Sequence, residues 1–213
     1  MKKIYLILLL VSFQSFSQNN GWFGYQLDSF AKFKLPVKNA SLFDSIDSGV
    51  EIYELSAKLN GVHYVGSKSV IEQSILPSDP KELYELYDNA VSQVKKSFPN
   101  SEETKSDITK SGYQGRKYTL KDENNFPVYS AELYLLENNL YMFYYINDAK
   151  EETVDSDYFF RSIFLSEDRN IEQFKGSSDF FKMMNLFKIE LLVVLGIFGL
   201  IITLIIKNRK KTA

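Results

Sequence analysis

The side chains that most often perform chemistry are few and scattered in this sequence. His63 is the only histidine, and the chain contains no cysteine. A histidine-based triad or a histidine metal site would therefore depend on this one residue. It follows Asn60-Gly61 in a strand-like pattern, which favours an ordinary strand side chain. The lack of cysteine excludes disulfides, thiol catalysis, cysteine-bound zinc and a lipid-modified N-terminal cysteine.

Two pairs of acidic residues could in principle bind a metal or perform acid–base catalysis. Asp155 and Asp157 supply oxygen ligands of the kind that calcium and magnesium prefer. No glycine-punctuated loop surrounds them, and both fit the first turn of a helix, where the helix dipole favours acids. Glu102 and Glu103 are adjacent in a polar segment, and a solvated turn explains them better than a glycosidase carboxylate pair.

The segment from Gly112 to Gly115 contains two glycines but lacks the Walker and dinucleotide-binding patterns. A tight turn is a sufficient explanation for it. Arg116 follows directly and could bind an anion, although a surface charge is the favoured interpretation. The formal net charge of −2 gives no electrostatic footprint for nucleic acid.

A run of aromatic residues offers the last candidate site. Alternation in a strand predicts Tyr141, Phe143 and Tyr145 on one face, with Met142 and Tyr144 on the other. Core packing explains most of these side chains, and one or two exposed members could contact a partner. We therefore predict no catalytic residue, no cofactor-binding residue and no metal ligand.

The N-terminal residues match an export signal. Met1-Lys2-Lys3 is a short basic region, and an apolar run follows from Ile4 to Phe13. Ser15 and Ser17 place small residues three positions and one position before a cut after residue 17. This order predicts a secretory signal peptide over residues 1–17.

The C-terminal residues match a membrane anchor. Residues 191–206 carry no charge, and the segment 186–206 is long enough to span a bilayer as one helix. The tail 207–213 is basic and is expected to stay in the cytoplasm. Residues 169–185 are then a juxtamembrane linker. These signals predict a single-pass protein of the bacterial cell membrane, with residues 18–168 forming one extracytoplasmic domain on the periplasmic side.

One helix within that domain has clear boundaries. Asp79 is a natural N-cap, Pro80 suits the first helical position, and Glu82 occupies the capping-box position. Residues of one apolar face then recur at helical spacing up to Pro99: Leu83, Leu86, Tyr87, Ala90, Val91, Val94 and Phe98.

Strand patterns flank this helix. Before it they cover residues 30–35, 41–46, 50–58 and 62–71, and after it residues 104–110, 116–121, 128–136 and 140–146. Asn60-Gly61 is the strongest hairpin turn signal, and residues 154–164 form a second helical pattern. Strands and helices in separate runs predict an α+β fold, an antiparallel sheet with helices packed on it.

Several short motifs of the domain resemble those of a known family. They are Phe33-Lys34-Leu35-Pro36, Gly112-Tyr113-Gln114-Gly115-Arg116-Lys117, Leu133-Tyr134-Leu135, Asn138-Asn139-Leu140-Tyr141 and Phe159-Phe160-Arg161-Ser162. In order and spacing they resemble the bacterial envelope branch of the PsbP-like family. The resemblance implies an α/β/α sandwich around an antiparallel sheet. It also implies a binding or accessory role, with no catalytic residue to carry over.

The combined expectation is a membrane-anchored extracytoplasmic binding or accessory module that is not an enzyme. Its partners would be the lipid bilayer, through the C-terminal helix, and another envelope protein. No nucleic acid, cofactor or small-molecule ligand is indicated. The alternative is an envelope hydrolase or a metal-dependent enzyme, and a cluster of Asp and Glu around His63 would favour it.

Overall fold

The computed structural model describes residues 21–47, 50–148, 154–168 and 170–176. The strands of this part are β1 (Phe23–Gln26), β2 (Ala31–Leu35), β3 (Ser41–Asp47), β4 (Val50–Leu59), β5 (Val62–Val70), β6 (Glu102–Lys110), β7 (Tyr113–Lys121), β8 (Pro127–Leu136), β9 (Asn139–Asn147) and β10 (Phe164–Leu165). The helices are a 3-10 turn η1 (Gln73–Ile75), α2 (Pro80–Lys96) and α3 (Val154–Arg161).

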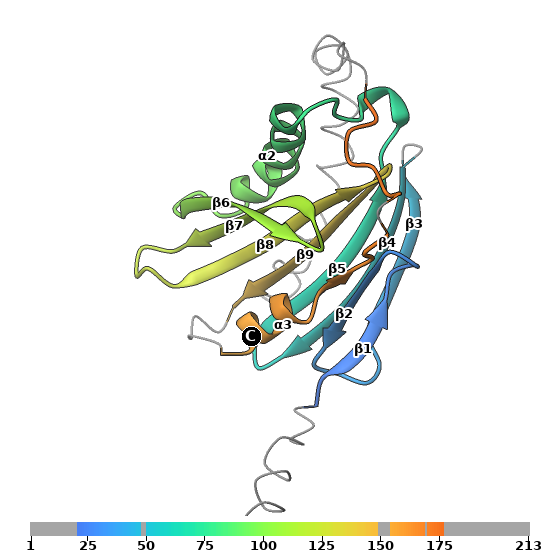
Figure 1. Cartoon of the computed structure of the whole chain (residues 1–213). Coiled ribbons are helices and arrows are strands. Elements are labelled where there is room, and N and C mark those ends of the chain that lie inside the picture. Colours follow the sequence, from blue (N-terminus) through green and yellow to red (C-terminus); the bar gives the residue numbers. More distant parts are fainter. Residues whose placement is uncertain (1–20, 48–49, 149–153, 169, 177–213) are drawn as a thin grey trace, which may run out of the picture.

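The strands form two sheets (Figure 1). The larger sheet has seven strands in the order β3-β4-β5-β9-β8-β7-β6, and the smaller has three in the order β1-β2-β10. Every pairing of neighbouring strands in both sheets is antiparallel. The outer strands of the larger sheet are therefore β3 and β6.

Short hairpins set the register of the larger sheet. The β4–β5 turn places Asn60 at φ 50° and Gly61 at φ 78°, the positive values that a tight hairpin needs. The prediction of a turn at Asn60-Gly61 is confirmed. The β6–β7 turn has the same geometry at Ser111 (φ 52°) and Gly112 (φ 87°), so it is shorter than the predicted Gly112–Gly115 turn.

Gly115 consequently lies inside β7, opposite Tyr134 of β8. A Cβ atom at Gly115 would lie 2.4 Å from the Tyr134 ring. The glycine is needed because this ring packs directly on the strand backbone.

Helix α2 follows the sequence prediction closely. The Asp79 side chain accepts a hydrogen bond of 2.9 Å from the Glu82 N–H and caps the helix. The Glu82 carboxylate accepts hydrogen bonds from the N–H and the hydroxyl of Ser78, both at 2.8 Å. Ser78 lies one residue before the N-cap Asp79, whose N–H a standard capping box would use. The predicted apolar face is buried from Leu83 to Val94.

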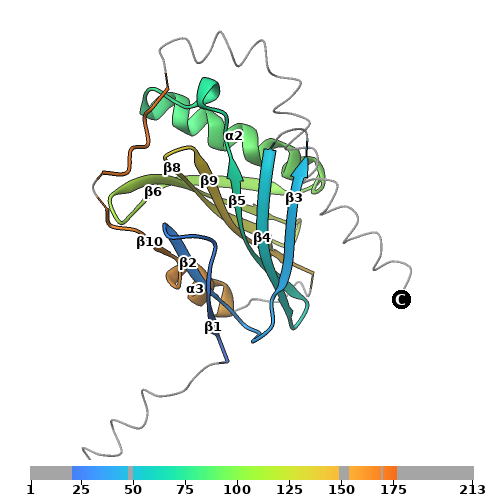
Figure 2. The same ribbon diagram turned by 90° about the vertical axis from the view of Figure 1, so that its right-hand side faces the viewer.

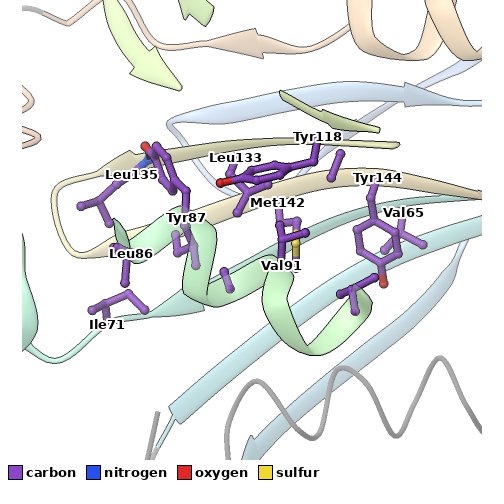
Figure 3. Close-up of a cluster of buried hydrophobic side chains, with 14 of the residues drawn as sticks. Val65, Ile71, Leu86, Tyr87, Val91, Tyr118, Leu133, Leu135, Met142 and Tyr144 are labelled. Carbon is purple, nitrogen blue, oxygen red and sulfur yellow. Dashed lines mark hydrogen bonds between the residues drawn. The ribbon is translucent and has the colours of Figure 1, made fainter. Parts of the chain in front are cut away.

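Three layers result from the packing of these elements (Figure 2). Helix α2 covers one face of the larger sheet, where Leu86, Tyr87 and Val91 pack among buried side chains of β7, β8 and β9 (Figure 3). The Tyr87 hydroxyl donates to the Gln114 carbonyl at 3.1 Å and accepts from the Leu135 N–H at 2.8 Å. These bonds anchor the centre of the helix to two strands.

The smaller sheet and α3 cover the opposite face with an aromatic core. Phe33 of β2 lies 5.4 Å from Phe143 of β9 and 6.2 Å from Phe159 of α3, measured between ring centroids. A Cβ atom at Gly66 of β5 would lie 2.4 Å from the Phe33 ring. The absence of a side chain at this point allows β2 to approach the larger sheet.

The predicted α/β/α sandwich is wrong. Among the described residues the protein is mostly antiparallel sheet, and its helices α2 and α3 have 17 and 8 residues. The second face is covered chiefly by a sheet because β2, predicted as part of one continuous sheet, pairs instead with β1 and β10. Alternating buried residues of β2 (Ala31, Phe33 and Leu35) then supply the contacts that a helix layer would have made.

No helix of the described residues is long and apolar enough to cross a membrane. The predicted signal peptide (1–17), membrane-spanning segment (186–206) and basic tail (207–213) lie outside the described residues. Part of the predicted linker is described. Its Gln173 side chain donates to the carbonyls of Gln114 and Leu135, both at 2.9 Å, so residues 170–176 pack against the domain.

Candidate functional site

His63 lies in β5 and is half-buried. Its partners in the neighbouring strands are Lys58 of β4 and Ile146 of β9. No group of three or more His, Asp or Glu side chains in the described part of the chain could hold a metal ion. The geometry therefore offers no support for a site built on this histidine.

The two pairs of acids lie on different elements, α3 and β6, and His63 lies on a third, β5. Asp155 and Asp157 occupy the first turn of α3, as predicted. Glu102 and Glu103 do not form a turn, because they begin the edge strand β6. Glu103 forms an ion pair of 2.8 Å with Lys95 of α2.

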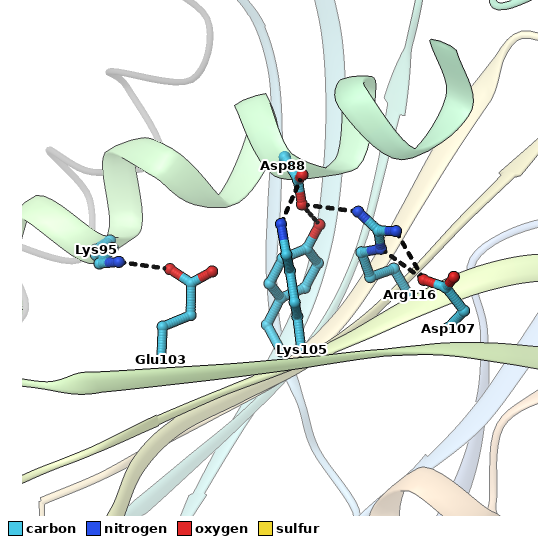
Figure 4. Close-up of polar contacts among 7 residues, drawn as sticks. Asp88, Lys95, Glu103, Lys105, Asp107 and Arg116 are labelled. Carbon is cyan, nitrogen blue, oxygen red and sulfur yellow. Dashed lines mark hydrogen bonds and ion pairs between the residues drawn. The ribbon is translucent and has the colours of Figure 1, made fainter. Parts of the chain in front are cut away.

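The interpretation of Arg116 as a surface charge is wrong. Only 12% of its side chain is exposed. The guanidinium donates to Asp107 at 2.8 Å and to Asp88 at 3.0 Å, and a second of its nitrogens forms an ion pair of 2.7 Å with Asp107 (Figure 4). It also lies 4.1 Å from the centroid of the Tyr84 ring. Two carboxylates already neutralise this cation, so the alternative of an anion site is not supported either.

Asp88 is the centre of this polar cluster. Its carboxylate also accepts hydrogen bonds from the Tyr118 hydroxyl at 2.6 Å and from Lys105 at 2.9 Å (Figure 4). Burial alone would raise the pKa of Asp88, but these bonds and the one from Arg116 lower it below its usual value. The cluster joins α2 to β6 and β7, which is a structural task.

The aromatic run of β9 is a core strand. Alternation is confirmed, because Tyr141, Phe143 and Tyr145 belong to the core under the smaller sheet, while Met142 and Tyr144 belong to the core under α2. All five side chains are buried, with at most 4% exposed. The prediction that core packing explains most of this run is confirmed, and the alternative of exposed members that contact a partner is not supported, because β9 lies at the centre of the larger sheet.

Sequence reasoning missed a buried carboxyl group at Glu54. This residue of β4 is 6% exposed and accepts a hydrogen bond of 3.3 Å from the Tyr144 hydroxyl. Burial raises the pKa of Glu54 to about 7, against the opposite effect of that hydrogen bond. Its position two residues after Ile52 was the available signal, since both share the face toward α2.

Two open pockets lie at the ends of the sheets. One, of about 490 Å³, has Phe98 and Val128 beside the acids Asp122 and Glu123. The other, of about 530 Å³, lies beside Tyr113. His63, Glu54 and Arg116 line neither pocket, so neither pocket brings together the side chains that are best suited to catalysis or ligand binding.

Among the described residues, the two most exposed large apolar side chains lie on the edge strand β3, together with a third exposed one. Leu42 is 60% exposed, Phe43 40% and Ile46 72%. Within the described residues no strand pairs with the outer side of β3. An edge strand presents unpaired backbone N–H and C=O groups, and apolar side chains beside them mark a place where another chain can pair. The weak strand pattern at residues 41–46 contained this signal, since its apolar residues fall on both faces.

The opposite edge is built differently. β6 has the sequence Glu-Glu-Thr-Lys-Ser-Asp-Ile-Thr-Lys, and its charged side chains protect an edge against pairing. Lys105 and Asp107 also belong to the polar cluster around Asp88, where Lys105 pairs with Asp88 and Asp107 pairs with Arg116. The candidate functional site is therefore the open edge of β3.

No protein-family model and no curated protein matches this chain. The resemblance to the PsbP-like family stays a prediction that rests on the short motifs alone.

Proposed function

We propose that this protein is an extracytoplasmic binding or accessory module, held at the membrane, that binds another envelope protein through β3. The observation that carries the proposal is the exposure of Leu42 and Ile46 on one face and of Phe43 on the other face of the same edge strand. Binding by strand addition uses main-chain hydrogen bonds for affinity and alternate side chains for specificity. Both elements are present on β3.

The contrast with the rest of the surface supports this choice. Isolated exposed apolar residues are normal on any protein. On β3, three such residues occur within five positions, beside a free backbone edge. An unpaired apolar edge makes the free protein prone to aggregate through this strand. A partner that pairs with β3 would remove that tendency.

The proposed location rests on the sequence signals at the two ends. Export by residues 1–17 and anchoring through residues 186–206 would place β3 outside the cytoplasm. Alkaline phosphatase fused after Gly176 should be active, and the same enzyme fused after Ala213 should be inactive. The reverse pattern would refute this location.

Binding can be tested with a single cysteine, because the natural chain contains none. The full chain carrying Ser41→Cys on β3 is labelled with a photoreactive group in native membranes. Ser106→Cys on β6 is the matched control. We expect a discrete protein adduct from Ser41→Cys and none from Ser106→Cys.

The same experiment includes a blocked edge. Leu42→Lys combined with Ile46→Lys should remove the adduct, because lysines on an exposed edge oppose pairing. Thr104→Lys combined with Ser106→Lys adds the same charge to β6 and should leave the adduct unchanged. Equal adducts from both edges, or an adduct that survives the lysines on β3, would contradict the proposal.

A further inference from the structure

We infer that the partner supplies an extended segment with Lys or Arg opposite Asp44 and an apolar residue two positions away on each side. This inference rests on the proposed function and specifies the partner for the same edge. It follows from the side chains that share one face of β3 and from the charges around them.

The side chains along β3 have a distinct order on one face. Leu42, Asp44 and Ile46 lie on one face because strand side chains alternate. All three are exposed. A strand added to β3 would place its own side chains directly opposite these three, close enough for opposed residues to contact. The edge therefore presents the pattern apolar, acidic, apolar.

The described strands next to β3 offer Asp44 no cation in its own row that is not already engaged. Its partner in β4 is Tyr53, and the partner of Tyr53 in β5 is Lys68. Lys68 is the first cation in this row, and it already forms an ion pair of 3.3 Å with Asp28. Ile46 pairs with Glu51 of β4, which is a second acid beside this edge. The face beside the edge is acidic.

The charge pattern of β3 disfavours a second copy of this chain as the natural occupant. A two-fold symmetric pairing of two β3 strands is antiparallel and self-complementary. The register that opposes Leu42 to Ile46 of the other copy also opposes Asp44 to Asp44 of that copy. Moving the centre of this pairing by one residue changes the residue opposite Asp44 by two positions, to Leu42 or to Ile46 of the other copy. Like charges opposite each other are destabilising, and a carboxylate facing an aliphatic side chain gains no partner.

A basic segment from a different protein avoids these conflicts. Its cation would face Asp44, and its two apolar residues would cover Leu42 and Ile46. The intervening side chains would lie on the other face, beside the exposed Phe43. The partner is therefore an extended segment with the pattern apolar, any, basic, any, apolar.

The test uses two fluorescent peptides with blocked ends. One is Gly-Thr-Val-Thr-Lys-Thr-Val-Thr-Gly, and the other has Glu in place of Lys. Binding to the full-length protein in detergent micelles is measured by fluorescence anisotropy. We expect the Lys peptide to bind about three- to tenfold more tightly, from one attractive and one repulsive cross-strand pair. Asp44→Lys should reverse this preference.

The outcomes separate the inference from the proposed function. Equal affinity for both peptides, or a preference that Asp44→Lys does not reverse, would overturn the basic partner, while the adduct from Ser41→Cys would still support binding at β3. Peptide binding that survives Leu42→Lys with Ile46→Lys would overturn both. An adduct with twice the mass of the chain would identify a second copy as the occupant. It would overturn both the basic partner and the choice of another envelope protein, while binding at β3 itself would stand.

Discussion

The two edges of the seven-stranded sheet are protected to very different degrees. β6 is rich in charge, and its Lys105 and Asp107 join the cluster around Asp88 on α2. β3 exposes Leu42 and Ile46, and within the described residues no ion pair connects it to another element. Charged side chains oppose pairing at the β6 edge, whereas the β3 edge remains available for pairing.

This difference shows how one sheet can serve both stability and recognition. Buried contacts with α2 hold the strands from β7 to β9, so that part does not depend on any partner. The exposed side chains of β3 contribute little to the core and can be used for binding without loss of fold. Substitutions on the two sides should therefore have opposite consequences for stability and for binding.

The largest expected effect on stability lies under α2. Leu86 is 1% exposed, and Leu86→Ala should lower the free energy of unfolding by about 2–5 kcal/mol, because it removes buried surface and leaves a cavity. Leu42→Ala makes the same chemical change at a side chain that is 60% exposed and should cost less than about 0.5 kcal/mol. Thermal unfolding followed by circular dichroism measures both. Similar losses would show that the β3 edge is part of the core.

The next effect is a pH dependence of stability, and it concerns Glu54 of β4, the strand next to β3. Because its folded-state pKa is about 7, above the ordinary glutamate value of 4.5, the folded state holds this proton more tightly than the unfolded state. The stability from the neutral carboxyl is complete below pH 4.5 and is lost as pH rises through 7. The loss approaches about 3 kcal/mol.

Glu54→Gln keeps a neutral side chain of similar shape and should flatten this profile. The variant should match the wild-type protein near pH 4.5 and exceed it in thermal stability above pH 7. Glu51→Gln removes an exposed acid from the same strand and serves as the control variant. A wild-type profile that rises between pH 5 and pH 8, with no difference for Glu54→Gln, would show that the carboxyl is ionised in the fold.

A smaller effect is expected in the cluster beside β6. Arg116→Met removes two charge-assisted hydrogen bonds and the ion pairs with Asp88 and Asp107 from a side chain that is 12% exposed, and it should cost about 1–3 kcal/mol. Lys105→Met removes another cation from the same Asp88, but its side chain is 48% exposed, and the cost should stay below about 1 kcal/mol. Urea unfolding distinguishes them. A larger loss for Lys105→Met would mean that the pair between Lys105 and Asp88 stabilises the cluster more than the pair between Arg116 and Asp88 does.

The smallest effect on stability should come from the edge that we assign to binding. Ile46→Lys replaces a side chain that is 72% exposed and should change the free energy of unfolding by less than about 0.5 kcal/mol. Ile108→Lys on β6 replaces a side chain packed partly against the core and should cost about 1 kcal/mol or more. Equal costs, measured by thermal unfolding, would remove the distinction between the two edges.

Much of the local structure could be predicted because its causes are local. Asn60-Gly61 specifies a hairpin through the positive φ values that these residues accept. Asp79 and Pro80 specify the start of α2, and an apolar period of 3.6 residues specifies its buried face. The alternation along β9 likewise assigned its side chains to two faces, although not their complete burial.

The candidate site could not be predicted in the same way. β10 pairs with β2 across more than a hundred residues of sequence, and that pairing separates the smaller sheet from the larger one. The order of strands in the larger sheet makes β9 central and β3 an edge. The sequence of β3 shows apolar residues without showing that nothing in the described chain pairs with them.

The sequence alone thus determined hairpins, a capped helix and alternating faces, since each depends on neighbours within a few residues. Only the tertiary structure decided which carboxyl groups are buried, that Arg116 is neutralised by two acids, and which strand has an open edge. The physical reason is that burial, ion pairing and edge position depend on contacts between segments that are distant in the chain. No local pattern specifies those contacts.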